Sequence, residues 1–183
     1  MYGLVNKAIE ELICRQHGAA AWRRIVERAG LDDTGFVSMD DYPDSVTYGL
    51  VQSASAELDV PGADLLEAFG RHWISYTGRE GYGELLDASG RSFDEFLDQL
   101  DALHSRVGLT LPNLRPPSFV VERGEPGAWR LRYYSERVGL APMVVGLVRG
   151  LADRFGMEVD VMLEAPRSAE SDCDVFAIRL AEA

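Results

Sequence analysis

The chain has 183 residues, of which 46% are hydrophobic and 26% charged, and its formal net charge is −12. This length and composition are typical of one globular domain with a sizeable core. The acidic balance excludes nucleic acid and anionic membrane surfaces as expected partners, because like charges repel, and no apolar run is long enough to span a bilayer.

The N-terminal stretch MYGLVNKAIEELICRQHG carries acidic and polar residues within its apolar pattern. This pattern predicts an amphipathic helix over about 4–16 and not a signal peptide. The two cysteines, Cys14 and Cys173, lie far apart, and neither belongs to a Cys-x-x-Cys pair. We therefore predict reduced thiols in a cytoplasmic protein that has no structural zinc site.

Apolar residues at helical spacing predict four further helices, over about 20–29, 44–58, 61–76 and 84–88. An acidic loop, LDDTGFVSMDDYPDS, separates the first two of these. The best-defined helix follows, because Ser92 and Glu95 form the capping box S-x-x-E at its start. Gly108 and the prolines of LTLPNLRPPSF are predicted to end it.

After this helix the apolar period changes to two, which is typical of strands. The segments SFVVERG and GAWRLRYYSER predict a hairpin around the turn from Gly124 to Gly127. A helix is predicted over about 140–155, and MEVDVMLEA and CDVFAIRL predict two more strands. The fold class is therefore α+β: a helical N-terminal part, followed by a four-stranded antiparallel sheet with helices.

The chain has three histidines in different settings. His17 is expected at the exposed end of the first helix, and His72 is expected at a helix surface or rim because it is offset from the apolar stripe. His104 follows Leu100 by four residues and Leu97 by seven, so it lies on the apolar face itself. Two interpretations fit that position: a core histidine bonded to a backbone carbonyl, or a neutral ligand to haem iron within an apolar pocket.

The segment YYSERVGL places hydrogen-bonding side chains at every second residue: Tyr133, Ser135 and Arg137. On a strand these three share one face. A half-polar sheet edge would explain them. A phenol, a hydroxyl and a planar guanidinium would also bind the anionic propionates of a haem.

Several segments together make the sequence recognisable: MYGLVNKAIEEL, DLLEAFGRHWISYTGREGYGELL, FLDQLDALHSRVGLTLPNLRPPSF, LRYYSERVGLAPMVVGLVRGLADRF and DCDVFAIRL. Over its whole length the chain resembles the H-NOX family, the haem-nitric oxide/oxygen-binding domains that include the haem domain of soluble guanylate cyclase. It is most similar to the stand-alone bacterial type. The resemblance implies a single H-NOX domain over 1–183, with a distal helical subdomain over about 1–62 and a proximal subdomain with the sheet over about 63–183. Haem b (iron protoporphyrin IX) is expected between them.

The resemblance also implies roles for individual residues. The histidine of LDALH ligates the haem iron in this family, which implies His104 as the metal ligand. The Y-x-S-x-R motif binds the propionates, which implies Tyr133, Ser135 and Arg137. A proline that presses on the porphyrin and distorts it corresponds to Pro117 of LRPPSF.

The opposite, distal side of the haem decides which gas binds. Bound oxygen carries partial negative charge and gains from a hydrogen-bond donor, whereas nitric oxide binds ferrous haem tightly without one. The region where oxygen-binding relatives carry a tyrosine reads VGLAPMVVGLV, with Pro142 to Val145 and no tyrosine. Trp73 is the one expected donor in the pocket. The cofactor-binding side chains expected besides Pro117 and the Y-x-S-x-R motif are Val5, Ile9, Trp73, Leu100 and Met143.

The sequence therefore predicts a sensor that binds nitric oxide and carbon monoxide at a five-coordinate ferrous haem and is not an enzyme. A haem peroxidase would need a distal acid–base pair, and the expected distal residues are apolar. With no output domain in the sequence, a separate effector is expected, and family members of this type pair with a histidine kinase or a cyclic-di-nucleotide enzyme. Two alternatives stay open: an oxygen-binding or redox-responsive haem sensor, and a haem-free module for a lipid or another tetrapyrrole.

Overall fold

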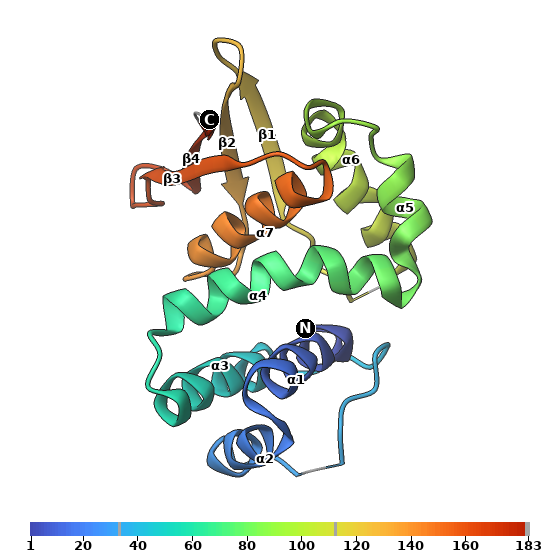
Figure 1. The fold of residues 1–183 in the computed structure, drawn as a ribbon, viewed down its shortest axis with the longest axis vertical. Helices are drawn as coiled ribbons and strands as arrows, with labels where there is room; N and C mark the ends of the chain where they lie inside the picture. Colours follow the sequence, from blue (N-terminus) through green and yellow to red (C-terminus); the bar gives the residue numbers. More distant parts are fainter. Residues whose placement is uncertain (33, 112, 182–183) are drawn as a thin grey trace.

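The computed structural model describes residues 1–32, 34–111 and 113–181, and Figure 1 shows their arrangement. The helices are α1 (Gly3–His17), α2 (Ala19–Arg28), α3 (Asp44–Leu58), α4 (Gly62–Thr77), α5 (Gly83–Ala88), α6 (Phe93–Thr110) and α7 (Ala141–Arg154). A π-helical turn, η1 (Gly78–Tyr82), joins α4 to α5. The strands are β1 (Ser118–Arg123), β2 (Ala128–Tyr134), β3 (Val159–Ala165) and β4 (Cys173–Leu180).

The four strands form one antiparallel sheet in the order β1-β2-β4-β3. The hairpin of β1 and β2 turns through Gly127, which has a φ of 79° and so occupies the left-handed region that glycine tolerates best. The predicted α+β class, with helices first and the sheet last, is confirmed. Among the helices of the described residues, none has the length and apolar character needed to cross a membrane.

Two predicted details differ from the structure. The helix α6 continues past Gly108 to Thr110. Pro112, one of the prolines expected to end that helix, lies outside the described residues. The strand β2 ends at Tyr134, so the prediction that Ser135 and Arg137 share its face with Tyr133 was wrong.

Pairing explains why β2 ends where it does. Tyr134 lies opposite Ser118 on one side and Cys173 on the other, and these are the first residues of β1 and β4. Beyond Tyr134 neither neighbour offers a strand partner. The Arg137 N–H instead donates to the Ser135 Oγ over 3.1 Å, which turns the chain away from the sheet.

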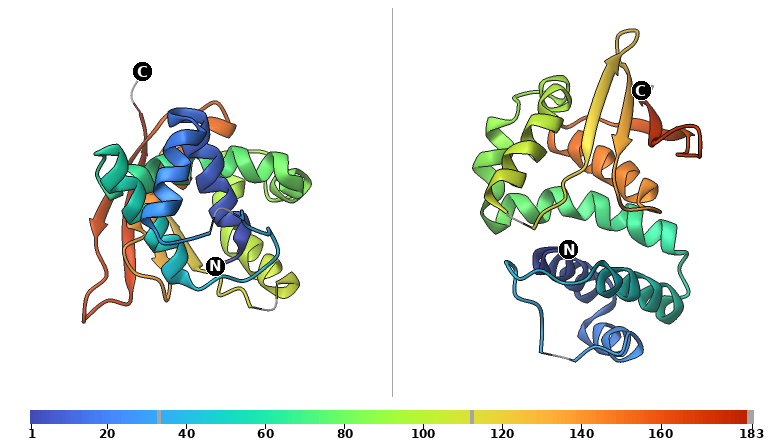
Figure 2. Two further views of the ribbon diagram at one scale, coloured as in Figure 1. Left: turned by 90° about the horizontal axis from the view of Figure 1, so that it is seen from below. Right: turned by 180° about the vertical axis from the view of Figure 1, so that it is seen from behind.

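Two hydrophobic clusters make up the core. One gathers side chains of α1, α2 and α3 with Phe69 and Tyr76 of α4, and the other joins the sheet with α6 and α7. Figures 1 and 2 show α4 running between these two parts, with α1 on one side and α7 on the other. The division of the chain into subdomains near residue 62 stays a prediction.

The backbones of α4 and α7 touch because glycines face each other across the contact. A Cβ at Gly146 would lie 1.9 Å from the Glu67 carbonyl oxygen, and one at Gly70 would lie 2.1 Å from the Met143 carbonyl oxygen. A Cβ at Gly150 would lie 2.7 Å from the Arg71 carbonyl oxygen. Side chains at these positions would force the helices apart, since packed interiors have little room for added atoms.

Gly146→Ala should therefore lower the free energy of unfolding by about 1–3 kcal/mol, the usual cost of overpacking. Gly49→Ala is the matched control, because Gly49 also lies within a helix but a Cβ there meets nothing within 4 Å. It should stabilise the protein by about 0.5–1 kcal/mol, since alanine favours a helix over glycine. Urea unfolding followed by circular dichroism measures both variants, and equal midpoints would contradict the close contact of α4 with α7.

Candidate functional site

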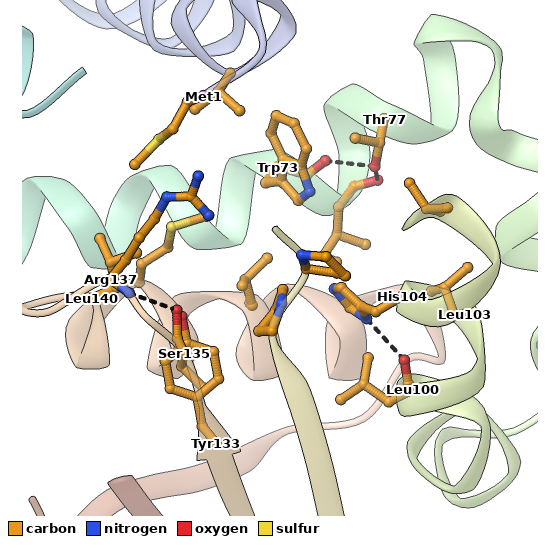
Figure 3. A pocket seen from close by; sticks show the side chains of 18 of the residues that line it. Met1, Trp73, Thr77, Leu100, Leu103, His104, Tyr133, Ser135, Arg137 and Leu140 are labelled. Atoms are coloured by element: carbon orange, nitrogen blue, oxygen red, sulfur yellow. Dashed lines mark hydrogen bonds between the residues drawn. The ribbon is translucent and has the colours of Figure 1, made fainter. Parts of the chain in front are cut away.

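An apolar cavity of about 310 Å³ lies between α1, α4, α6, α7 and the sheet. Its volume is in the range of ligand pockets. Every residue predicted for the site lines it: Val5, Ile9, Trp73, Leu100, His104, Pro117, Tyr133, Ser135, Arg137 and Met143. Figure 3 shows His104 reaching in from α6, with Tyr133, Ser135 and Arg137 gathered away from it at another part of the wall.

The helix α6 positions His104. Its first turn is fixed by the Ser92 Oγ, which accepts from the Glu95 N–H over 3.2 Å, and by the Glu95 carboxylate, which accepts from the Arg91 N–H over 2.8 Å. Three turns later, His104 Nδ1 donates to the Leu100 carbonyl oxygen over 2.8 Å. This bond fixes both the tautomer and the orientation of the ring, and leaves the lone pair on Nε2.

The electrostatic setting keeps His104 neutral. Its ring keeps some accessible surface only because it borders the cavity, while packed protein surrounds it on the other sides. Burial holds the pKa of His104 below its ordinary value, against the opposing effects of the hydrogen bond to Leu100 and the charge of Asp101. A neutral imidazole is the form that binds a metal.

A row of rings connects His104 to the Y-x-S-x-R motif. The ring centroids of His104 and Phe119 are 4.8 Å apart, and those of Phe119 and Tyr133 are 5.5 Å apart. The Asp101 carboxylate fixes Phe119 by accepting from its backbone N–H over 2.8 Å. Phe119 was not among the predicted site residues, although the alternation of SFVVERG could have identified it as an inward residue of β1.

Arg137 lies at one end of the cavity, where its guanidinium is already bound. Nε and Nη2 donate to the two carboxylate oxygens of Asp44 over 2.8 and 3.2 Å, and Nη1 donates to the Arg115 carbonyl oxygen over 3.0 Å. The N-terminal ammonium of Met1 also donates to Asp44, over 2.9 Å. Although burial alone would raise it, these two cations hold the pKa of Asp44 below its ordinary value.

The cavity opens beside Arg137 into a second, more polar hollow of about 720 Å³. The two spaces share Met1, Leu114, Arg115 and Arg137. Asp41, Tyr42, Pro43, Asp44 and Asn113 complete the lining of the polar hollow. An occupant of the cavity can therefore bury an apolar body and place charged groups at a mouth where Arg137, Arg115 and the Met1 ammonium lie beside Asp41 and Asp44.

The distal wall differs in part from the prediction. Of the stretch 142–145, Met143 and Val144 line the cavity but Pro142 and Val145 do not. Several polar residues that the sequence analysis missed also line it: Tyr2, Thr47, Tyr48, Thr77 and Tyr82. Thr77 follows Trp73 by four residues on α4, so helical spacing could have identified it. The other four reach the cavity through the packing of separate elements, which no local pattern indicates.

Most of these hydroxyls already have acceptors within the protein. Thr47 donates to Asn6 Oδ1 over 2.7 Å, Thr77 to the Trp73 carbonyl oxygen over 2.8 Å, and Tyr48 to the Val138 carbonyl oxygen over 3.0 Å. The Trp73 indole N–H has no hydrogen-bond partner within the described part of the chain. Trp73 and Tyr82 therefore have donors open to a small ligand, and so does Tyr2, whose hydroxyl only accepts, from the Asn113 N–H over 3.3 Å.

Most of the chain matches a known protein family. The family model described as Haem-NO-binding matches residues 2–163. The chain belongs to the Haem-NO-binding family. It is 31% identical over 179 residues to soluble guanylate cyclase gcy-35 of Caenorhabditis elegans, an alignment that covers 96% of this chain and 26% of that protein. The chain thus spans about a quarter of the length of the curated relatives it matches.

Solved structures agree with this fold. The unliganded Fe(II) H-NOX protein from K. algicida is 25% identical, with a TM-score of 0.85 and coverage of 100% of this chain and 98% of that one. An H-NOX protein from S. oneidensis in the Fe(II)NO ligation state is 21% identical, with a TM-score of 0.88 and full coverage of both chains. The second likeness shows the fold alone. The H-NOX fold expected from the sequence is confirmed.

Haem-NO-binding domains are haem-based gas sensors, and the residues of this chain fit a haem. The neutral His104 offers Nε2 to an iron, the apolar walls suit a porphyrin, and the cationic mouth suits two propionates.

The other two histidines lie away from this chemistry. His17 is exposed, as predicted. His72 was expected at a surface or rim, and this was wrong: its side chain is only 2% exposed, and Nε2 lies 3.6 Å from the Glu11 carboxylate on α1. The helix α1 packs against the side of α4 opposite α7, so α4 is buried well beyond its apolar stripe. Neither ring nitrogen of His72 has a hydrogen-bond partner in the described structure.

Stability should depend on pH through His72. Burial lowers its pKa, against the attraction of Glu11. The unfolded chain therefore binds a proton first, and the free energy of unfolding should fall as the pH drops from about 7.5 to about 5.5. His72→Gln should make that decline shallower, although His104, whose pKa is also lowered, retains part of it. Urea unfolding of the haem-free protein at several pH values tests this. His17→Gln should follow the wild type, and a His72→Gln curve parallel to both would contradict the prediction.

Proposed function

We propose that the protein is a haem-based sensor that binds nitric oxide and carbon monoxide and signals to a separate effector protein. The single observation that carries this proposal is the composition of one cavity. Apolar walls join a neutral histidine, His104, to a cationic mouth at Arg137, and the cavity lies within a Haem-NO-binding fold. Haem b in its ferrous form supplies an iron atom that binds diatomic gases directly.

Each side chain then has a role toward the haem. His104 coordinates the iron through Nε2, and Arg137, Tyr133 and Ser135 donate to the propionates. Pro117 and Leu100 pack against the porphyrin on the side of His104. The remaining apolar side chains exclude water from the face where gas binds, and they are Val5, Ile9, Trp73 and Met143.

The contacts of α6 limit where a change at His104 acts. Three aspartates of this helix bind the sheet: Asp94 accepts from the Trp129 indole, Asp98 from the Arg123 guanidinium, and Asp101 from the Phe119 N–H. The last of these bonds comes one turn before His104. If the tether on His104 were changed, the part of α6 free to respond would therefore be its last turns, which end at Thr110.

The proposal is non-catalytic. The relatives named guanylate cyclases are several times longer than this chain, which aligns with about a quarter of gcy-35. Their cyclase activity is therefore not transferred to it. A histidine kinase or a cyclic-di-nucleotide enzyme stays the expected effector, and the cytoplasmic location stays a prediction.

The ligand assignment predicts a loss and a rescue. His104→Gly should purify with little haem, because no other described side chain replaces Nε2 at that wall of the cavity. Added imidazole should restore the Soret band by occupying the space left by the ring. The ratio of Soret to protein absorbance measures both effects, with His17→Gly as the control. If His104→Gly keeps its haem and its ferrous spectrum without imidazole, another residue is the ligand. A wild type that takes up no haem would favour the haem-free alternative.

The distal wall predicts gas selectivity. Nitric oxide and carbon monoxide should each shift the Soret band of the reduced protein, whereas air should give no stable shift, because the wall around Ile9 and Met143 is apolar. Absorption spectra under each gas test this. A lasting shift in air would instead support the oxygen-binding alternative. In that case Trp73→Phe, Tyr82→Phe and Tyr2→Phe would identify the donor, since each removes one open N–H or O–H.

A further inference from the structure

The segment 135–139, which carries Ser135 and Arg137, is held by side chains and not by a strand. Its carbonyl groups nevertheless have donors. Arg167 donates to the carbonyl oxygen of Ser135 over 2.5 Å and to that of Arg137 over 3.3 Å. Tyr48 donates to the carbonyl oxygen of Val138 over 3.0 Å. Two of these three backbone contacts thus come from one guanidinium.

Arg167 is itself firmly placed. It lies between β3 and β4, and its guanidinium also donates to the Asp172 carbonyl oxygen over 3.0 Å. Its backbone N–H donates to Asp174 Oδ1 over 2.8 Å. Asp174 is buried and lies directly opposite Tyr133 in the register of β2 and β4. Asp174 therefore links Tyr133, which it faces across the sheet, to Arg167, which holds the backbone of Ser135 and Arg137.

We propose that Arg167 is the positioning residue of the propionate clamp formed by Tyr133, Ser135 and Arg137, an inference that rests on the proposed haem function. Asp44 and the Arg115 carbonyl hold the guanidinium of Arg137, and Arg167 holds its backbone. Arg167 lies beyond residue 163, where the family match ends. It touches the clamp through carbonyl oxygens and contacts no group that would bind the haem.

The planar fork of arginine is essential to this role. Nη1 and Nη2 reach three carbonyl oxygens at once, two in the segment 135–139 and one at Asp172. A lysine ammonium keeps the charge but concentrates its donors at one point, so it cannot span all three acceptors. Arg167→Lys should therefore recover only part of what Arg167→Ala loses.

The experiment compares two porphyrins in the same variants. Haem-free wild type, Arg167→Ala, Arg167→Lys and Arg137→Ala are each loaded with haem or with its dimethyl ester, in which both propionates are uncharged. Dissociation is followed by transfer to excess apomyoglobin. For haem, Arg167→Ala should speed dissociation about threefold to tenfold, and Arg137→Ala should speed it about tenfold to a hundredfold. For the dimethyl ester, both ratios should fall toward one.

A purely structural role for Arg167 gives a different result. In that case Arg167→Ala would speed the loss of both porphyrins equally, and the proposal would be overturned. Unchanged dissociation of haem in Arg167→Ala would overturn it as well. Combined with Arg137→Ala, the Arg167→Ala change should add less than it does alone, because both act on the same clamp; full additivity would contradict a positioning role.

Two further measurements keep the outcome clear. Arg130→Ala is the control, since Arg130 makes a similar two-bond ion pair, with Glu164, on the same strand as Tyr133 but away from the clamp. It should leave both dissociation rates unchanged. If Arg167→Ala does not fold, the two-porphyrin comparison is made with Arg167→Lys. A wild type that binds no haem would refute the haem function itself, whereas a haem-loaded wild type with an unaffected Arg167→Lys would refute only the role of Arg167.

Discussion

The close approach of α4 to α7 is the constraint on which the site depends. With no side chain at Gly70, Gly146 or Gly150, the two backbones meet and α4 becomes a fixed partition between the two hydrophobic clusters. The helix α4 therefore contributes to both parts: Trp73 lines the cavity, and His72 is buried against α1. A wider spacing of the helices would move the distal wall relative to His104 and change the shape of the cavity.

Three positive groups gather at the mouth of the cavity, although the chain as a whole is acidic. The net charge is −12, yet the mouth of the cavity gathers the guanidinium of Arg137, that of Arg115 and the ammonium of Met1. Carboxylates balance them: Asp44 binds Arg137 and Met1, Asp41 lies 3.4 Å from the Met1 ammonium, and Glu136 pairs with Arg115. These contacts hold the cations in place without a ligand. A bound propionate would therefore meet donors that are already ordered.

A continuous row of contacts links the two ends of the cavity. The ring row of His104, Phe119 and Tyr133 crosses from α6 through β1 to β2, and Asp101 fixes its middle member. From Tyr133 the register of the sheet leads to Asp174 and on to Arg167. A displacement at His104 therefore has a continuous packed route to the loop between β3 and β4.

Local patterns in the sequence determined the elements and the α+β class, because helical and strand periods are written in nearby residues, and several motif segments together carried the family resemblance. Spacing also placed His104 on the apolar face with Leu100, and alternation singled out Tyr133, Ser135 and Arg137, while the family resemblance implied their roles toward a haem. Local patterns could not predict contacts between segments that are distant in sequence. Only the tertiary structure decided that β2 stops at Tyr134, where both neighbouring strands begin, and that α1 buries His72. It alone brought Asp44 and Arg167 to Arg137, across 93 and 30 residues of chain, because such pairs depend on how elements pack and not on any repeating interval.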